Sequence, residues 1–89
     1  MLERDLVISN KLGLHARASA KLVQLLQGYK SNAWLKCRGR EVNAKSIMGV
    51  MMLAAGLGTP LTLKVEGPDE DVALAALVDL FESKFDEGQ

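Results

Sequence analysis

Short apolar runs bounded by turn-forming residues predict four β-strands along the 89-residue chain. The run DLVIS at 5–9 ends in a polar loop that contains glycine, so it predicts a buried strand. The segments 33–37 and 40–44 predict a hairpin with Gly39 in its turn. The segment 61–66 alternates strictly, which predicts a strand with one polar face and one apolar face, made of Leu61, Leu63 and Val65.

Apolar residues at helical spacing predict three helices. The stretch 16–27 ends before Gly28, a preferred C-cap residue, and carries an apolar face of Leu22, Val23 and Leu26. Ser46 is a preferred N-cap residue and precedes an apolar stretch, which predicts a short helix from 47 to about 53. The last helix begins near Pro68 with an acidic first turn, favoured by the helix dipole, and its apolar positions are Ala73, Ala76, Leu77, Leu80 and Phe81.

The predicted order of elements is strand, helix, strand, strand, helix, strand, helix. Helices gathered on one face of a mostly antiparallel sheet form an α+β open-faced β-sandwich, which is the fold class that we expect. With 48% hydrophobic and 25% charged residues, the 89-residue chain has the composition of one globular domain that spans residues 1–89. Only the last four residues, DEGQ, are typical of a disordered end.

The composition argues against several classes of protein. The first ten residues carry three charges, and no apolar run has the length of a membrane span, so we expect a cytoplasmic protein without membrane insertion. Cys37 is the only cysteine and His15 the only histidine, so we expect no internal disulfide, no metal and no cofactor. The basic residues form no run and only 4% of residues are aromatic, so we expect no nucleic-acid partner.

Charge is distributed unevenly along the chain, although the formal net charge is zero. Residues 1–65 contain ten Lys or Arg and three Asp or Glu (10 − 3 = +7), whereas residues 66–89 contain one and eight (1 − 8 = −7). The basic part could steer acidic partners toward the protein, or both parts could be solvated surfaces that balance each other. The sequence is compatible with both interpretations.

The stretch GLHARASA places His15 directly before the first predicted helix and two residues from Arg17. The start of a helix presents unpaired backbone N–H groups and a positive dipole end, which attract an anion and disfavour a protonated imidazole. A neutral histidine can attack phosphorus and form a covalent phosphoryl intermediate. The N–H groups of Ala16, Arg17 and Ala18, with the Arg17 guanidinium, would then bind the phosphoryl oxygens. The chain has no Walker-A loop and no magnesium-binding cluster, so it would carry a phosphoryl group rather than take one from a nucleotide by itself.

Each of these residues also has a purely structural interpretation. His15 could pack at the end of a loop, and Arg17 could be a solvated helix residue. Ser46 could be an N-cap alone, although an N-cap hydroxyl can also receive a phosphate. The second predicted helix has too many apolar residues for one buried face, so we expect an exposed docking surface for partners at Ile47, Met48, Met51 and Met52.

Two long motifs resemble the HPr family, the histidine-containing phosphocarriers of the bacterial phosphoenolpyruvate:sugar phosphotransferase system. NKLGLHARASAKLV resembles the active-site segment of the family, and VNAKSIMGVMMLAAGLGTPLTLKVEGPDE resembles its second signature. The resemblance covers essentially the whole chain. It implies a four-stranded antiparallel sheet covered on one face by three helices, His15 as the residue phosphorylated at Nδ1, and Arg17 as its assistant. It further implies that Ser46 matches the position modified by a dedicated kinase in some members.

By the same resemblance, the chain is a phosphocarrier and not an enzyme. It would accept a phosphoryl group from phosphoenolpyruvate through enzyme I and pass it to IIA-type domains, and we expect it to act as a monomer. A serine kinase/phosphorylase acting on Ser46 would be a regulatory partner. The family stretch runs His-Ala-Arg-Pro, whereas this chain has Ala18 at the proline position, which loosens the start of the helix. The ending LFESKFDE is similar to the nitrogen-related branch of the family, so the sugar and nitrogen branches both stay open.

Two other functions compete with the phosphocarrier. An acylphosphatase-like hydrolase also places an arginine-bearing loop before a helix on a small α+β sandwich, but this sequence lacks the glycine-rich phosphate loop of such an enzyme. A regulatory binding module would use phosphorylated Ser46 to change docking and would give His15 little role.

Overall fold

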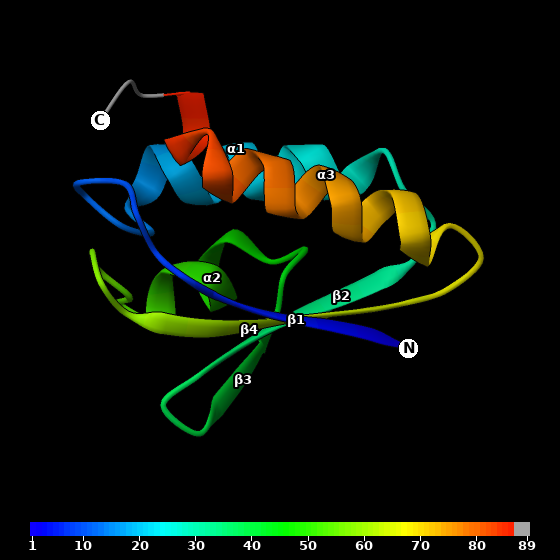
Figure 1. The fold of residues 1–89 in the computed structure, drawn as a ribbon, viewed down its shortest axis with the longest axis horizontal. Helices are drawn as coiled ribbons and strands as arrows, with labels where there is room; N and C mark the ends of the chain where they lie inside the picture. Colours follow the sequence, from blue (N-terminus) through cyan, green and yellow to red (C-terminus); the bar gives the residue numbers. More distant parts are fainter. Residues whose placement is uncertain (87–89) are drawn as a thin grey trace.

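The fold is an antiparallel β-sheet with helices packed on one of its faces (Figure 1). The computed structural model describes residues 1–86. The sheet has four strands in the order β1-β4-β2-β3, and all neighbouring strands are antiparallel. In chain order the elements are β1 Leu2–Val7, α1 Ala16–Gln27, β2 Asn32–Cys37, β3 Arg40–Asn43, α2 Ile47–Met52, β4 Pro60–Glu66, α3 Glu70–Glu82 and the 3₁₀-helix η1 Lys84–Asp86. The predicted open-faced β-sandwich is confirmed.

The first strand begins and ends earlier than the sequence predicts. β1 pairs with β4 along all six of its residues, so the predicted range of 5–9 is wrong at both ends. Charged Glu3 and Arg4 belong to the strand because β1 lies at the edge of the sheet, where their side chains reach solvent. Ile8 is buried but follows the strand, and its N–H donates to the Thr59 carbonyl at 3.0 Å. The apolar run therefore marks burial here and not the extent of the strand.

The remaining predicted elements are confirmed with small changes at their ends. α1 has the predicted bounds, its predicted apolar face is buried, and Gly28 is its C-cap. The β2–β3 hairpin turns at Arg38 and Gly39, whose positive φ values of 51° and 79° are typical of a two-residue type I′ turn. α2 begins after Ser46, as predicted, and ends at Met52, one residue before the predicted end.

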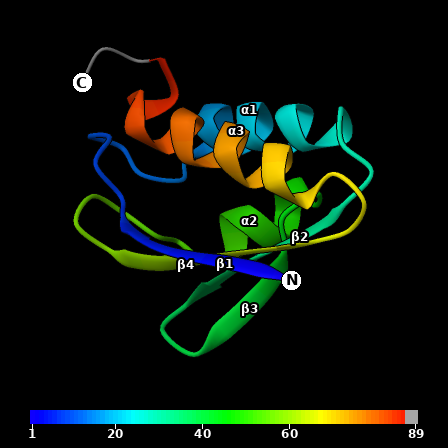
Figure 2. The ribbon, with the colours of Figure 1, turned by 45° about the vertical axis from the view of Figure 1, so that its right-hand side comes forward.

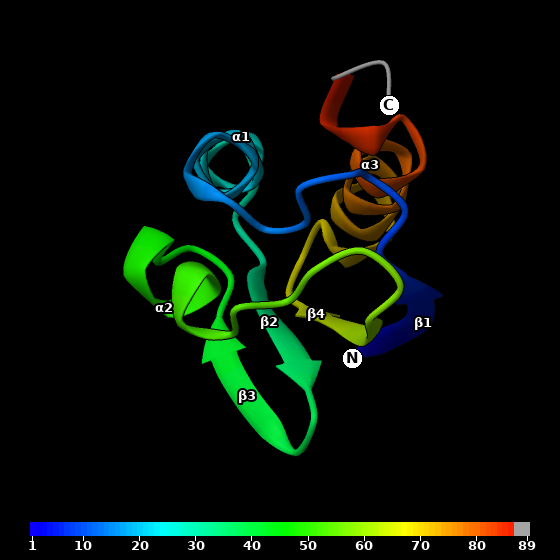
Figure 3. The same ribbon diagram turned by 90° about the vertical axis from the view of Figure 1, so that its left-hand side faces the viewer.

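The core lies between the sheet and a layer formed by α1 and α3, which run side by side (Figures 2 and 3). Six inward-facing sheet residues are at most 2% exposed: Ala33, Leu35, Cys37, Leu61, Leu63 and Val65. α3 adds four buried residues to this core, Ala73, Leu77, Val78 and Phe81, whereas Ala76 and Leu80 are only half-buried. Among the described elements, no helix covers the opposite face of the sheet (Figure 3).

A short left-handed turn after α3 closes the described part of the chain, and the sequence pattern does not predict it. Its three residues, which form η1, have φ values between 56° and 59°. Phe85 is fully buried at its centre, with its ring edge-on to that of Phe81 at a centroid distance of 4.9 Å. The Lys21 ammonium group of α1 donates to the Phe85 carbonyl at 2.5 Å. Of the DEGQ end, Asp86 belongs to η1, and the other residues lie outside the described part of the chain.

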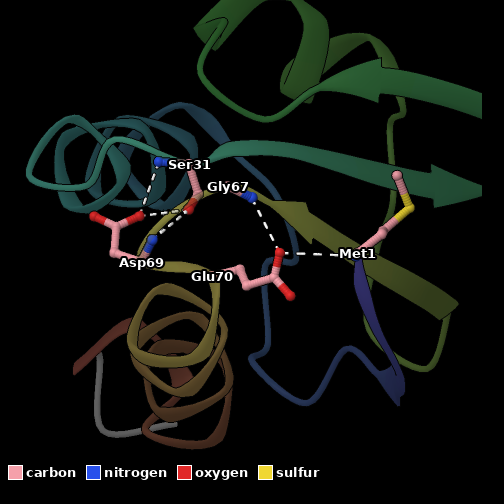
Figure 4. Close-up of polar contacts among 5 residues, drawn as sticks. All are labelled: Met1, Ser31, Gly67, Asp69 and Glu70. Atoms are coloured by element: carbon pink, nitrogen blue, oxygen red, sulfur yellow. Dashed lines mark hydrogen bonds and ion pairs between the residues drawn. The ribbon is translucent and has the colours of Figure 1, made fainter.

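Asp69 ties the start of α3 to the connection between α1 and β2 (Figure 4). Its carboxylate accepts hydrogen bonds from the Ser31 hydroxyl, from the Ser31 N–H at 2.9 Å and from the Lys30 N–H at 2.8 Å. The Ser31 hydroxyl above all, and then the backbone donors, hold the pKa of Asp69 below its ordinary value. Glu70 accepts from the Gly67 N–H at 3.1 Å and lies 3.7 Å from the N-terminal amine. The acidic start of α3 therefore connects this helix to other parts of the fold.

Candidate functional site

His15 is the N-cap residue of α1, with an extended backbone (φ −75°, ψ 179°) and a half-buried side chain. The first backbone hydrogen bond of the helix runs from the Ser19 N–H to the His15 carbonyl at 2.9 Å. Within residues 1–86, the N–H groups of Ala16, Arg17 and Ala18 donate no hydrogen bond, as is usual in the first turn of a helix. Ala16 and Arg17 are exposed, whereas Ala18 is buried. The structure thus brings together His15, three backbone donors and the Arg17 side chain at one helix start.

Local hydrogen bonds shape the loop that leads to His15. Buried Asn10 donates from Nδ2 to the Gly13 carbonyl at 2.8 Å, and the Gly13 N–H donates to the Asn10 carbonyl at 3.2 Å. The Ser19 hydroxyl, also buried, donates to the Leu14 carbonyl at 3.2 Å. Two buried polar side chains therefore bind the carbonyl groups of Gly13 and Leu14, the two residues before His15. Sequence analysis did not identify Asn10, Gly13 or Ser19 as functional, although the polar residues and the glycine of 10–13 do predict a loop.

The segment that follows α2 holds the His15 loop from the other side (Figure 3). The Leu14 N–H donates to the Ala55 carbonyl at 2.9 Å. Gly13 has φ +65°, and a Cβ atom at this position would lie 2.4 Å from the Ala55 oxygen and 2.6 Å from the Gly56 Cα. Ala54 adopts a positive φ of 50°, which is unfavourable for a residue with a Cβ. Because this contact joins residues about 40 positions apart, no local sequence signal could reveal it.

Ser46 begins α2 and not α1, so it belongs to a different helix from His15. Its hydroxyl oxygen accepts a hydrogen bond from the Gly49 N–H at 3.1 Å, which confirms the predicted N-cap. Val50 is the one buried residue of α2. Four exposed apolar residues of this helix form a surface that we call the methionine face: Ile47, Met48, Met51 and Met52. α2 thus offers an apolar surface next to α1 (Figure 3).

Two further exposed apolar residues border the His15 loop, and sequence analysis missed both. Leu12 is 63% exposed and directly precedes Gly13. Leu57 is 61% exposed and directly follows Gly56, the residue that Gly13 approaches. A solvated leucine in a loop gives no signal in a hydrophobicity pattern, so only the fold reveals that both lie close to the site.

A hollow in the protein surface lies away from His15. It opens on the uncovered face of the sheet and is lined by residues of β1, β2 and β4, including Asp5, Lys36, Thr62 and Lys64. None of the predicted site residues lines it. In the described part of the chain, no group of three or more His, Cys, Asp or Glu could hold a metal ion, and no helix could cross a membrane. His15 therefore lies at the start of α1 and outside this hollow.

The sequence matches a known family over nearly its whole length. Residues 2–83 match the model described as "PTS HPr component phosphorylation site". This match agrees with the open-faced sandwich and with the helix start at the lone histidine. Together they define the class of protein, a phosphocarrier of the phosphotransferase system. The chain belongs to the HPr family.

Relatives and solved structures agree with this assignment. The phosphocarrier protein HPr of Xylella fastidiosa (strain 9a5c) is 58% identical over 87 residues, which is 98% of each chain. The phosphocarrier protein NPr of Shewanella violacea is 42% identical over 86 residues, which is 97% of this chain and 94% of the NPr. The crystal structure of HPr-C-His from Thermoanaerobacter tengcongensis matches with a TM-score of 0.94 and 48% identity, over 98% of both chains. An HPr dimer from the same organism matches with a TM-score of 0.76, over 96% of this chain and 98% of the other.

Proposed function

We propose that the chain acts in the cytoplasm as a monomeric, single-domain phosphoryl carrier whose phosphorylated residue is His15. It accepts a phosphoryl group from phosphoenolpyruvate through enzyme I and passes it to a IIA-type domain. The observation that carries the proposal is the position of the only histidine at a helix start with three unpaired N–H groups among the described residues. Such a helix start stabilises a transferred anionic group without further change of the backbone.

The transfer consists of two displacements at phosphorus. In the first, Nδ1 of His15 donates its lone pair to phosphorus while the bond between phosphorus and the enzyme I donor breaks. In the second, a nucleophile of the IIA-type domain attacks the same phosphorus atom, and the bond electrons return to Nδ1. The N–H groups of Ala16, Arg17 and Ala18 bind the phosphoryl oxygens between these steps, and the exposed Arg17 guanidinium adds a charge-assisted donor.

The carrier does not hydrolyse its phosphoryl group and is not an enzyme in its own right. An acylphosphatase-like reaction would need a water molecule activated beside the phosphoryl group. The exposed helix start offers donors to the oxygens, but within residues 1–86 no carboxylate belongs to the first turn of α1 to act as a base. This favours transfer to a protein partner over transfer to water.

α2 gives the carrier a docking surface and a regulatory position. The methionine face binds enzyme I and IIA-type domains, because flexible, exposed methionines adapt to different partner surfaces. A serine kinase/phosphorylase modifies Ser46 at the edge of this surface. A phosphate there would add negative charge beside the methionine face while it strengthened the N-cap of α2.

The test is phosphorylation of the parent protein and of His15→Ala by phosphoenolpyruvate and enzyme I. We expect about one acid-labile phosphate per chain in the parent and none in the variant. Trp34 fluorescence during urea unfolding checks that the variant is folded. In Arg17→Ala, uptake slows roughly ten- to a thousandfold but does not vanish, since one of several donors is lost. Acid-labile phosphate in folded His15→Ala, or release of inorganic phosphate by the parent without a labelled chain, would contradict the carrier function.

A further inference from the structure

The C-terminal end of α2 depends on two arginines from the β2–β3 hairpin. Arg38 Nη2 donates to the Leu53 carbonyl at 2.6 Å, and Arg40 Nη1 lies 3.5 Å from the Met52 carbonyl. The last carbonyl groups of a helix accept no hydrogen bond from within the helix, and they carry a partial negative charge. α2 has six residues and no basic residue in its own last turn. Arg38 therefore supplies from another element the charged donor that this short helix lacks.

The carbonyl that Arg38 binds lies two residues from the one that holds the His15 loop. Leu53 is buried and is the C-cap residue of α2. Ala54 follows with its left-handed backbone, and the Ala55 carbonyl then accepts from the Leu14 N–H at 2.9 Å. Residues 53–55, which we call the bridge segment, thus contact Arg38 at one end and the residue before His15 at the other.

We propose that Arg38 is a positioning residue for phosphoryl transfer, which acts by fixing the bridge segment against the loop that carries His15. This inference rests on the proposed function of His15. Without the guanidinium, the strained backbone at Ala54 is free to relax, and the Ala55 carbonyl moves away from Leu14. His15 then loses its fixed position at the start of α1, and transfer requires that the position be restored in each encounter.

Arg38 also carries a positive charge, so a simple effect on association must be separated from positioning. Loss of a surface charge weakens the encounter with a partner of opposite charge, raises KM and is suppressed by salt. Loss of a positioning contact lowers kcat at saturating partner, and salt does not restore it. Arg4 is a matched control, because it is an exposed arginine on the edge strand β1 and its side chain makes no hydrogen bond within the described chain.

The experiment compares Arg38→Met, Arg38→Lys and Arg4→Met with the parent. Amide hydrogen exchange of Leu14 reports directly on its bond to the Ala55 carbonyl, and the exchange of Leu35 in β2 reports on the core. In Arg38→Met we expect Leu14 to exchange about tenfold faster and Leu35 at the parent rate. We expect kcat for uptake from enzyme I to fall several-fold at both low and high salt. Arg38→Lys restores part of both effects, since its ammonium can still donate, and Arg4→Met leaves the Leu14 exchange and kcat unchanged.

The outcomes separate the inference from the function on which it rests. If the parent takes up phosphate normally and Arg38→Met has parental Leu14 exchange and kcat, the positioning role is wrong. The same holds if Arg38→Met and Arg4→Met raise KM equally at low salt and nothing else changes, because Arg38 then acts only as a charge. A parent that takes up no acid-labile phosphate would refute the proposed function itself, and with it the role of Arg38 in transfer.

Discussion

Replacement of Gly13 by alanine tests how closely the His15 loop is packed. Two effects add in this variant. The new side chain is forced into φ +65°, which costs about 1–2 kcal/mol. Its Cβ would lie 2.4 Å from the Ala55 oxygen, and such overpacking costs about 1–3 kcal/mol. The lower entropy of the unfolded chain offsets about 0.4–1 kcal/mol. We therefore expect Gly13→Ala to lower the free energy of unfolding by roughly 1–4.6 kcal/mol.

Gly58→Ala separates the two effects. Gly58 has a similar positive φ of 84°, but a Cβ there would have no atom within 4 Å. Its variant should lose only about 0–1.6 kcal/mol, since the backbone cost of about 1–2 kcal/mol is offset by the same entropy effect and no overlap is added. Urea unfolding followed by Trp34 fluorescence gives both values, and uptake of acid-labile phosphate reports on the site. We expect slower uptake in Gly13→Ala, because any shift that relieves the overlap moves Leu14 and His15. If both variants lose the same stability to within about 0.5 kcal/mol, the close approach of Gly13 to Ala55 does not exist in solution.

Three other variants test separate parts of the structure. The pKa of Asp69 is lower in the folded protein than in the unfolded chain, so ionised Asp69 stabilises the fold above the ordinary aspartate range. This stabilisation is lost as pH falls through the folded pKa. In Asp69→Asn, the urea midpoint should therefore fall less than in the parent when pH is lowered from about 5 to 2. Ser46→Asp should keep or raise the thermal stability, since Asp is also a good N-cap, but slow uptake from enzyme I, most strongly at low salt. Ala18→Pro should add a few tenths to about 1 kcal/mol of stability. Slower uptake in that more stable variant would show that the Ala18 N–H binds the phosphoryl group.

The elements with complete local signals were predicted well, and β1 was not. The apolar face of α1 and its C-cap glycine can both be recognised in the sequence, so the predicted and observed bounds of this helix agree. The range of β1 depends on its pairing with β4, which lies more than 50 residues away, and the burial of Ile8 hides where this pairing ends. The left-handed turn at η1 has no local signal either, since its three residues are not glycine. Buried Phe85, packed on Phe81, is a tertiary reason for this turn.

The candidate site also contains residues that the sequence predicts and residues that it does not. His15, Arg17 and the N-cap role of Ser46 follow from short motifs and the general properties of helix starts. The parts that position His15 do not, because the Ala55 carbonyl and the Arg38 guanidinium come from distant segments. Sequence patterns therefore identify the reacting group, whereas the contacts that fix its position require the folded chain.

The structure also separates the two interpretations of the basic excess in residues 1–65. None of the three α-helices has a basic residue in its last turn. Instead, Lys45 donates to the Tyr29 carbonyl after α1 at 3.0 Å, Arg38 donates to Leu53 at the end of α2, and Lys21 donates to Phe85 after α3. These charges neutralise carbonyl groups at helix ends and are poor reporters of partner binding, because their removal also perturbs the fold. Arg17 is exposed at the helix start that bears His15, and its side chain makes no hydrogen bond within residues 1–86, so its charge is the appropriate one to remove in a test of electrostatic steering.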